Sequence, residues 1–454
     1  MPPSLIASVR ALSAPPRLFL TFTAVNVLSW QCIAGQSLVL FARAVAMPPS
    51  LVGVLLSFMP LSMLLVAFAF PLVERFGPRR LLLSTWLVRN FLASVVFVMP
   101  WAMRSHGPAA GWWVLLLATL AFSLTRAVGV GGWYPWLHEI VPREQLGSYF
   151  SVETGMGQVV TILVAVGMAL VLALGAGLDR FFWIYGAGIV AGLASVLLIR
   201  RIPGGSAPPS AADLCCPPRP ASLRRVWADP GYRHFLLLAI WGLASVMWLN
   251  SAMVMYLRDM LGYGETGIML LLALGGIGVA LTVTCWGRAA DRFGSVPAMI
   301  QLLAAHSLFA LAWWGLVPGW RGTAWLAPPA VLFSLVFNAA FGMVVARGML
   351  CRVRGDDRVG YTALWVVCVS LANGVPPILA GWLIDALGLA GFRLCFLAAG
   401  LGGFAAAGLM LRLGPEKGKP PHPALHHLIR PSQPLRSLGR VFWITLGLGE
   451  KGSG

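Results

Sequence analysis

The sequence predicts an all-α membrane protein in which twelve transmembrane helices form two six-helix bundles related by pseudo-two-fold symmetry. Three observations carry this prediction: the composition, a series of apolar segments, and a short motif that occurs twice. The chain of 454 residues is 58% hydrophobic and only 11% charged, whereas a soluble globular domain carries about 25% charged residues. Because so few charges cannot cover a water-facing surface, most of the surface must face lipid.

Twelve apolar segments occupy most of the chain, and each is long enough to cross a hydrocarbon core of about 30 Å as a helix. They must be helical because lipid offers no hydrogen-bond partners to the backbone. The alternating pattern of a closed strand barrel is not visible. The segments are expected at residues 18–41, 51–73, 80–101, 112–138, 153–177, 181–199, 234–257, 266–287, 297–318, 325–347, 361–384 and 391–411.

The distribution of arginine predicts the orientation of these segments. Arginine is much more frequent in the loops on the side of the N-terminus than in those on the other side, and basic loops remain in the cytoplasm. We therefore expect a multi-pass protein of the cell inner (plasma) membrane with both termini in the cytoplasm. Its expected parts are a cytoplasmic N-terminus (1–17), a first bundle (18–200), a cytoplasmic linker loop (201–233), a second bundle (234–412) and a cytoplasmic tail (413–454).

Composition also excludes several classes of function. The formal net charge of +18 would suit a nucleic-acid partner, but basic cytoplasmic loops explain it better, so we expect no nucleic acid. The seven cysteines show no metal-ligand spacing, and there is no phosphate-binding loop of an ATPase. We expect no metal and no cofactor. A membrane enzyme would need clustered acid and base groups, and the nearest candidate is the isolated pair His138-Glu139. We therefore expect a protein that is not an enzyme.

The motif that occurs twice lies at residues 287–294 and, in a weaker form, at residues 70–77. Both copies keep the order acid-Arg-Phe-Gly, and they lie nearly half a chain length apart. Two further loops, 143–149 and 355–361, share a Gly and a Tyr and repeat at nearly the same offset. The chain is therefore interpreted as two similar halves.

Twelve segments in two halves, a central loop and the paired turns together resemble the major facilitator superfamily of transporters over about residues 15–412. The copy at 287–294 matches the family pattern Gly-x-x-x-Asp-Arg-x-Gly. The first copy departs from it at Phe70, Glu74 and Pro78. The resemblance implies a conformational latch that is made in one state and broken in another. Its residues would be Glu74, Arg75, Gly77, Gly287, Asp291, Arg292 and Gly294.

The resemblance also implies partners for this latch. Asp291 is expected at the start of helix five, near Ser148 and Ser151, and Glu74 is expected near Thr362 in helix eleven. An acid at a helix N-terminus is favoured by the helix dipole. A glycine one turn before the acid, Gly287, is expected to let two helices approach closely. The alternative is that both turns are only tight charged loops that set the topology.

In this family, helices one, four, seven and ten line the central cavity, so polar groups in those segments are candidate ligands. We expect five such groups: Gln31, Arg126, Trp248, Asn250 and Asn338. An arginine inside a span needs a reason, because it costs about 2.5–3.5 kcal/mol on insertion scales. Arg126 is therefore the sharpest candidate and Arg89 the second. Either an anionic ligand neutralises them or an internal partner does, such as Glu153 for Arg126. For the amides, packing between helices is the alternative.

The sequence thus predicts secondary active or facilitative transport of a small organic solute, anionic or amphipathic, by alternating access. The expected partners are that solute, the lipid bilayer and a proton as the coupling ion of a symporter or antiporter, and the expected state is a monomer. The alternative is a transporter-like sensor or assembly protein that moves no solute. A liposome flux assay distinguishes the two, because a sensor binds without counterflow.

Overall fold

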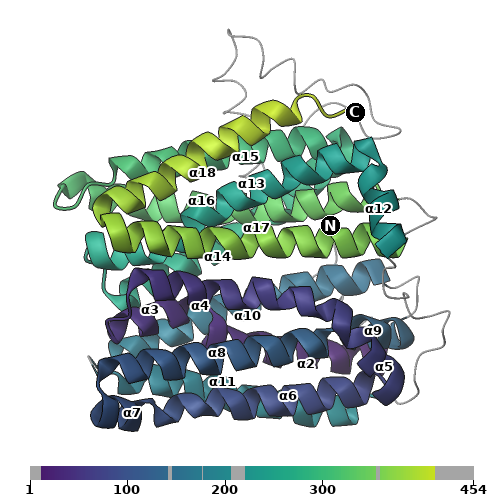
Figure 1. Ribbon diagram of the computed structural model, residues 1–454, viewed down its shortest axis with the longest axis horizontal. Coiled ribbons are helices and arrows are strands. Elements are labelled where there is room, and N and C mark those ends of the chain that lie inside the picture. The colour runs from purple at the N-terminus through teal and green to yellow at the C-terminus, as the bar shows by residue number, and fades with distance from the viewer. Residues whose placement is uncertain (1–11, 142–145, 176, 206–219, 354–357, 415–454) are drawn as a thin grey trace. The chain divides into compact units, whose positions relative to one another are not determined.

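The computed structural model describes residues 12–141, 146–175, 177–205, 220–353 and 358–414. Throughout these ranges the regular elements are helices. The chain divides into two compact units, one formed by Met1–Arg219 and Gly264–Leu270 and the other by Pro220–Tyr263 and Leu271–Gly454. Figure 1 shows the helices of each unit running alongside one another.

The first unit contains the helices of the first repeat. They are α2 (Ala14–Ala34), α3 (Gln36–Ala44), α4 (Pro49–Ser62), the 3-10 helix η1 (Met63–Ala69), α5 (Phe70–Phe76), α6 (Pro78–Ser94), the 3-10 helix η2 (Val95–Val98), α7 (Met99–His106), α8 (Pro108–Val130), α9 (Trp133–Ile140), α10 (Leu146–Ala173) and α11 (Asp179–Arg201). Within it α2 packs against α10 and α11, and α6 packs against α8 and α11.

The second unit contains the helices of the second repeat, except that the first turn of α14 groups with the first unit. They are α12 (Pro220–Ala228), α13 (Pro230–Met255), the π-helical turn η4 (Tyr256–Met260), α14 (Glu265–Phe293), α15 (Ser295–Ala312), the 3-10 helix η5 (Trp313–Gly315), α16 (Arg321–Leu350), α17 (Arg358–Leu387) and α18 (Leu389–Met410). Here α13 packs against α17 and α18, and α15 packs against α16 and α18.

The predicted fold class is confirmed. The described part of the chain holds 12 helical stretches long and apolar enough to cross a membrane. The second span shows how sequence shapes a helix locally. Pro60 lies inside α4, and the chain tightens to η1 from Met63 before continuing as α5. Proline has no N–H and clashes with the preceding turn, so an α-helix is easily disturbed where it occurs.

Each unit has its own buried core. In the first unit an aromatic cluster joins α2, α6 and α9, with Phe19, Phe22 and Trp133 in edge or tilted ring contacts 5.0–5.4 Å between centroids. In the second unit Phe235, Phe337 and many aliphatic side chains of α12 to α18 form a buried cluster. These cores hold the helices of a unit at the fixed spacing on which its polar contacts depend.

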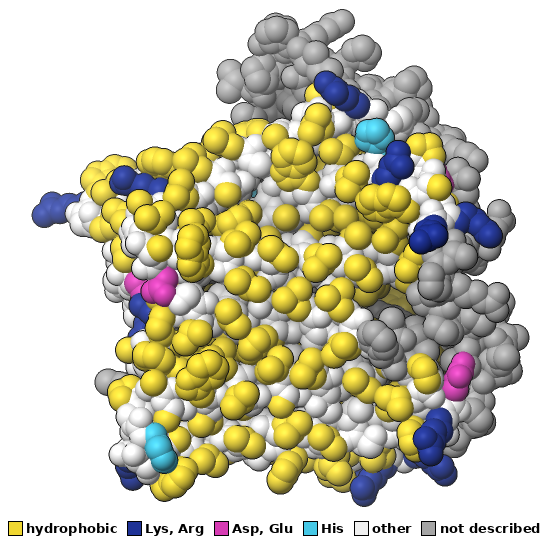
Figure 2. Space-filling view, viewed as in Figure 1, with side chains coloured by type: hydrophobic (Ala, Val, Ile, Leu, Met, Phe, Trp, Pro, Cys, Tyr) yellow, Lys and Arg dark blue, Asp and Glu magenta, His cyan; other side chains and the backbone are white. Residues whose placement is uncertain are grey.

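The outer faces of the spans are also apolar. Large hydrophobic side chains such as Trp183 and Trp325 are 74% and 84% exposed. Figure 2 shows hydrophobic side chains along the helices on the face in view, with charged side chains mainly toward the helix ends. A soluble protein rarely exposes so much apolar surface, whereas a bilayer requires it. The expectation that most of the surface faces lipid therefore agrees with the structure.

Candidate functional site

The two copies of the repeated motif build the same turn. Gly77 connects α5 to α6 and Gly294 connects α14 to α15, with φ of 77° and 94°. Each donates its backbone N–H to the carbonyl four residues earlier, on Val73 and Ala290, at 2.9 Å. A side chain makes positive φ costly, so glycine is the residue that allows this helix end. The motif glycines therefore have a backbone role in both halves.

The motif arginines also behave alike. The guanidinium carbon of Arg75 lies 5.4 Å from the ring centre of Phe76, and that of Arg292 lies 5.3 Å from the ring centre of Phe293. Both arginines are exposed, as is Glu74. Glu74 makes no hydrogen bond or ion pair with any residue that the structure describes. The expected contact of Glu74 with the eleventh span, α17, stays a prediction.

Asp291 is held inside the second unit by α16. Its Oδ1 accepts a hydrogen bond from Arg347 Nε at 2.8 Å, and Arg347 Nη1 donates to Ser295 Oγ at 2.5 Å. The Asp291 side chain is 71% exposed and that of Arg347 is 27% exposed. Arg347 thus ties the motif acid to the first residue of α15. The expected contact of Asp291 with the start of the fifth span, α10, stays a prediction.

Gly287 has room beside it within its own unit. A Cβ built at this position would lie 3.8 Å from Met343 Cε, its nearest described neighbour. That distance is an ordinary van der Waals contact. No described neighbour therefore requires a glycine here, and the close approach of two helices that we expected at Gly287 stays a prediction.

Two of the five expected cavity groups lie in the first unit. Gln31 on α2 donates from Nε2 to Thr161 Oγ1 of α10 at 3.3 Å, which is the helix–helix contact that we gave as the alternative role of an amide. Arg126 on α8 is half-buried, and its Nη1 lies 3.6 Å from Met63 Sδ. Arg126 therefore keeps part of its surface accessible at membrane depth.

The other three expected groups lie in the second unit. Trp248 and Asn250 are on α13, Asn338 is on α16, and all three are half-buried. The Oδ1 atom of Asn250 is buried and has no hydrogen-bond partner among the described residues. An unsatisfied amide oxygen at membrane depth is costly. The role of these three as ligands of a solute stays a prediction.

The most unusual polar cluster lies in the core of the first unit, around Arg89. This side chain on α6 is 0% exposed. Its Nη2 donates to Asn26 Oδ1 of α2 at 2.6 Å, and Trp86 Nε1 donates to the same oxygen at 3.0 Å. The guanidinium carbon lies 4.1 Å from the Trp86 ring centre and 5.1 Å from that of Phe122 on α8. We expected Arg89 only as a second candidate and did not foresee this role of Asn26.

Arg89 has fewer partners than its charge requires. Its Nε and Nη1 atoms are buried without a hydrogen-bond partner, and none of the described acids forms an ion pair with it. Arg126 lies close enough to repel it electrostatically. The aromatic rings contribute cation–π attraction, about 2 kcal/mol or more at a desolvated site. That is less than the several kcal/mol that burial of an ion costs, so the described contacts do not fully compensate the burial of Arg89.

Glu153 is the internal partner that we considered for Arg126. It is half-buried near the start of α10 and lies close to Thr23 of α2. Burial and the charge of Glu153 raise the pKa of the neighbouring Tyr149. The role of Glu153 as the internal partner of Arg126 stays a prediction.

Glu139 belongs to a structural clamp, whereas the side chain of His138 lies outside the described part of the structure. Glu139 Oε2 accepts the N–H of Gly205 at 2.9 Å, and Trp136 Nε1 donates to Pro203 O at 3.1 Å. Arg79 closes the clamp by donating its backbone N–H to Gly205 O at 3.0 Å. These contacts fix the chain beyond α11 to α6 and α9. No group of three potential metal ligands occurs in the described ranges.

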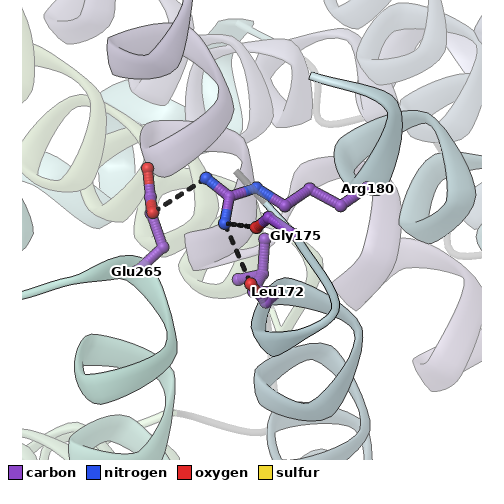
Figure 3. A network of polar contacts seen from close by, with 4 residues as sticks. All are labelled: Leu172, Gly175, Arg180 and Glu265. Atoms are coloured by element: carbon purple, nitrogen blue, oxygen red, sulfur yellow. Dashed lines mark hydrogen bonds and ion pairs between the residues drawn. The ribbon is translucent and has the colours of Figure 1, made fainter. Parts of the chain in front are cut away.

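A second polar network lies at the opposite ends of α10 and α11 (Figure 3). Arg180 Nη1 donates to the carbonyls of Leu172 and Gly175, at 2.9 and 2.6 Å, at the end of α10. Its Nη2 pairs with Glu265 Oε2 at 3.0 Å, on the first turn of α14. The two side chains are only 14% and 17% exposed. A cation at a helix C-terminus satisfies free carbonyls and the helix dipole, so this pair stabilises three helix ends together.

Comparison with known proteins supports the family that the motifs indicated. The family model of the Major Facilitator Superfamily matches residues 19–351 and 235–449. No curated protein matches the sequence.

Several solved transporters share the fold. The nucleoside transporter NupG has a TM-score of 0.62 and 10% identity, covering 88% of this chain and 98% of its own. The D-xylose-proton symporter has a TM-score of 0.64 and 16% identity, covering 89% of this chain and 99% of its own. A bacterial homologue of the iron transporter ferroportin, in its inward-facing state, has a TM-score of 0.65 and 14% identity, covering 88% of this chain and 98% of its own. The twelve spans, the twice-built turn and the family match agree, and the chain belongs to the major facilitator superfamily of membrane transporters.

Proposed function

We propose that this transporter carries a small organic solute with an anionic group, by alternating access, across the inner membrane. Membership of the family establishes membrane transport in general terms. The observation that carries the anionic substrate is the cluster of Arg89 and Arg126 in the first unit. One guanidinium is fully buried with two unpartnered nitrogens, and the other is half-buried beside it.

The electrostatics of the spans support this choice. The buried guanidinium of Arg89 adds positive potential at the half-buried Arg126, since the two groups interact electrostatically. Charge interactions are stronger in a low-dielectric interior than in water. An anionic group that reaches Arg126 would therefore gain attraction from both guanidinium groups, and a planar carboxylate or a phosphate suits the fork of an arginine.

The same proposal includes the membrane topology. The arginine-rich turns at Gly77 and Gly294 would lie in the cytoplasm, together with both termini, because basic loops are retained on that side. The network of Arg180 and Glu265 would then lie at the outer face. The motif turn of the second half would bias the transport cycle, since Asp291 is fixed in position by Arg347.

Purified protein in liposomes tests the proposal. Counterflow of labelled organic anions is measured against neutral and cationic solutes of similar size. We expect flux only for an anionic class, and we expect Arg126→Gln to abolish it. Arg126→Lys should retain part of it, because Lys keeps the charge but loses the bidentate geometry. Arg104→Gln is the matched control, since Arg104 is exposed at the far end of its span.

Three outcomes would contradict the proposal. Equal flux of neutral solutes would remove the anionic specificity. Undiminished flux in Arg126→Gln would remove Arg126 from the site. Binding of an anion without any counterflow would favour the sensor or assembly protein. A proton gradient imposed across the same liposomes tests whether the carrier is a proton symporter or antiporter.

A further inference from the structure

The short helix α12 presents two different faces. Val226 is 1% exposed and belongs to the main core cluster of the second unit, where α12 packs against α13 and α17. On the other side Arg224, Arg225 and Trp227 are exposed, the tryptophan by 43%. An amphipathic helix with an apolar ring and cations on its free face is typical of an element that lies at a membrane surface.

The structure holds α12 firmly at the start of α13. Asp229 Oδ1 accepts the N–H groups of Gly231 and Tyr232, at 3.1 and 3.4 Å, and so caps α13. Its Oδ2 accepts the hydroxyl of Tyr361 on α17 at 2.8 Å. Arg233 Nη1 reaches back to Trp227 O at 3.5 Å. The free face of α12 therefore has a fixed position relative to the end of a membrane span.

The charge of this face is not balanced within the described structure. Arg224, Arg225 and the exposed His234 form no ion pair with a described residue. The nearest acid in the sequence is Asp229, and both of its oxygens already accept hydrogen bonds from the unit itself. Among the described residues, the arginines are thus a pair of adjacent, exposed cations without a counter-charge.

We propose that the free face of α12 binds the headgroup of an anionic phospholipid. Only Asp229 separates the end of the helix at Ala228 from Pro230, where the span of α13 begins, so its free face lies at headgroup depth. Arg224 and Arg225 contact the lipid phosphate, and Trp227 lies at the boundary with the acyl chains, where tryptophan is favoured. This proposal does not depend on which solute is carried, because the lipid site uses no residue of the cluster around Arg89.

Native mass spectrometry of the full chain in detergent tests this site. Phosphatidylglycerol is titrated against phosphatidylcholine, and bound lipids are counted. We expect saturable binding of phosphatidylglycerol that R224Q/R225Q weakens about 25-fold, at about five-fold for each arginine near a membrane surface. R104Q/R321Q removes two exposed arginines from the other ends of the spans and is the matched control. Binding of phosphatidylglycerol by this control should stay within about two-fold of that by the natural sequence.

Two further measurements guard against a change in folding and against a different ligand. The charge-conserving pair R224K/R225K should keep binding within about three-fold, because attraction to a surface depends on charge, and higher salt should weaken binding to the natural sequence. Inorganic phosphate at the same concentration should not displace the lipid, since it offers nothing to Trp227. Wild-type affinity in R224Q/R225Q, an equal loss in the control, loss of binding in the lysine pair, or displacement by phosphate would each overturn the proposal.

Discussion

Replacement of Asn26 tests the buried cluster of the first unit most directly. Its Oδ1 is the single acceptor for both Arg89 Nη2, at 2.6 Å, and Trp86 Nε1, at 3.0 Å. Asn26 is only 8% exposed, so water cannot easily replace it. Asn26→Leu removes the acceptor at nearly constant size, and Asn26→Asp replaces the amide by a carboxylate of the same shape.

The two variants are expected to move stability in opposite directions. Asn26→Leu removes a bond to a charged donor, worth about 1.5–3 kcal/mol, and strands the indole N–H, at a cost of about 1–3 kcal/mol. We therefore expect a loss of about 2.5–6 kcal/mol in the free energy of unfolding. Asn26→Asp supplies the missing negative charge at 2.6 Å from the guanidinium, and an ionised hydrogen bond is roughly twice as strong as a neutral one. We expect it to be at least as stable as the natural sequence.

Unfolding in mixed micelles, followed by tryptophan fluorescence, measures both effects. A double-mutant cycle with Arg89→Met isolates the coupling, because methionine fills the space without a charge. The gain of Asn26→Asp should disappear in that background. If the proposed substrate is anionic, Asn26→Asp should also weaken its binding, since the new carboxylate neutralises the cluster.

Two results would refute this reasoning about Asn26. One is a change below about 0.5 kcal/mol for Asn26→Leu, which would place it among ordinary surface substitutions. The other is equal destabilisation by the aspartate and leucine variants, which would mean that Arg89 is already neutralised.

The remaining predictions concern the turns and the helix ends. Gly294→Ala should lower the stability by about 1–2 kcal/mol, because Gly294 has a positive φ. Gly287→Ala lies inside α14 with room for a Cβ and should raise the stability by up to about 1 kcal/mol. Thermal melts that rank the two variants equally would contradict this. Arg180→Gln should lower the melting temperature more than Glu265→Gln, because Arg180 also binds the carbonyls of Leu172 and Gly175 at the end of α10. The reverse order would show that the ion pair alone matters. Asp291→Asn should change stability by less than about 1 kcal/mol, since the pair is exposed, yet it should shift the inward-to-outward ratio in a cysteine-accessibility assay; an unchanged ratio would exclude the latch.

The partners of the predicted residues depend on contacts that sequence does not encode locally. Arg89 was recognisable as a charge in an apolar segment, but Asn26, 63 residues earlier, became its partner only when α2 and α6 packed together. Arg126 looked the sharper candidate, yet it is half-buried, whereas Arg89 is fully buried. Hydropathy reports that a residue lies in a span and gives no information about which neighbours its side chain will meet.

By itself the sequence determined the number of spans, the repeat and the turn at Gly77 and Gly294. These are local properties, because a bilayer requires about 20 apolar residues in each helix and a positive φ at a helix end favours glycine. Only the tertiary structure decided what the polar groups bind. Asp291 pairs with Arg347, 56 residues away, and Glu139 holds Gly205, 66 residues away. Such pairs form because apolar packing fixes the helix spacing first, and the few charges then bond to whatever donor or acceptor lies within reach.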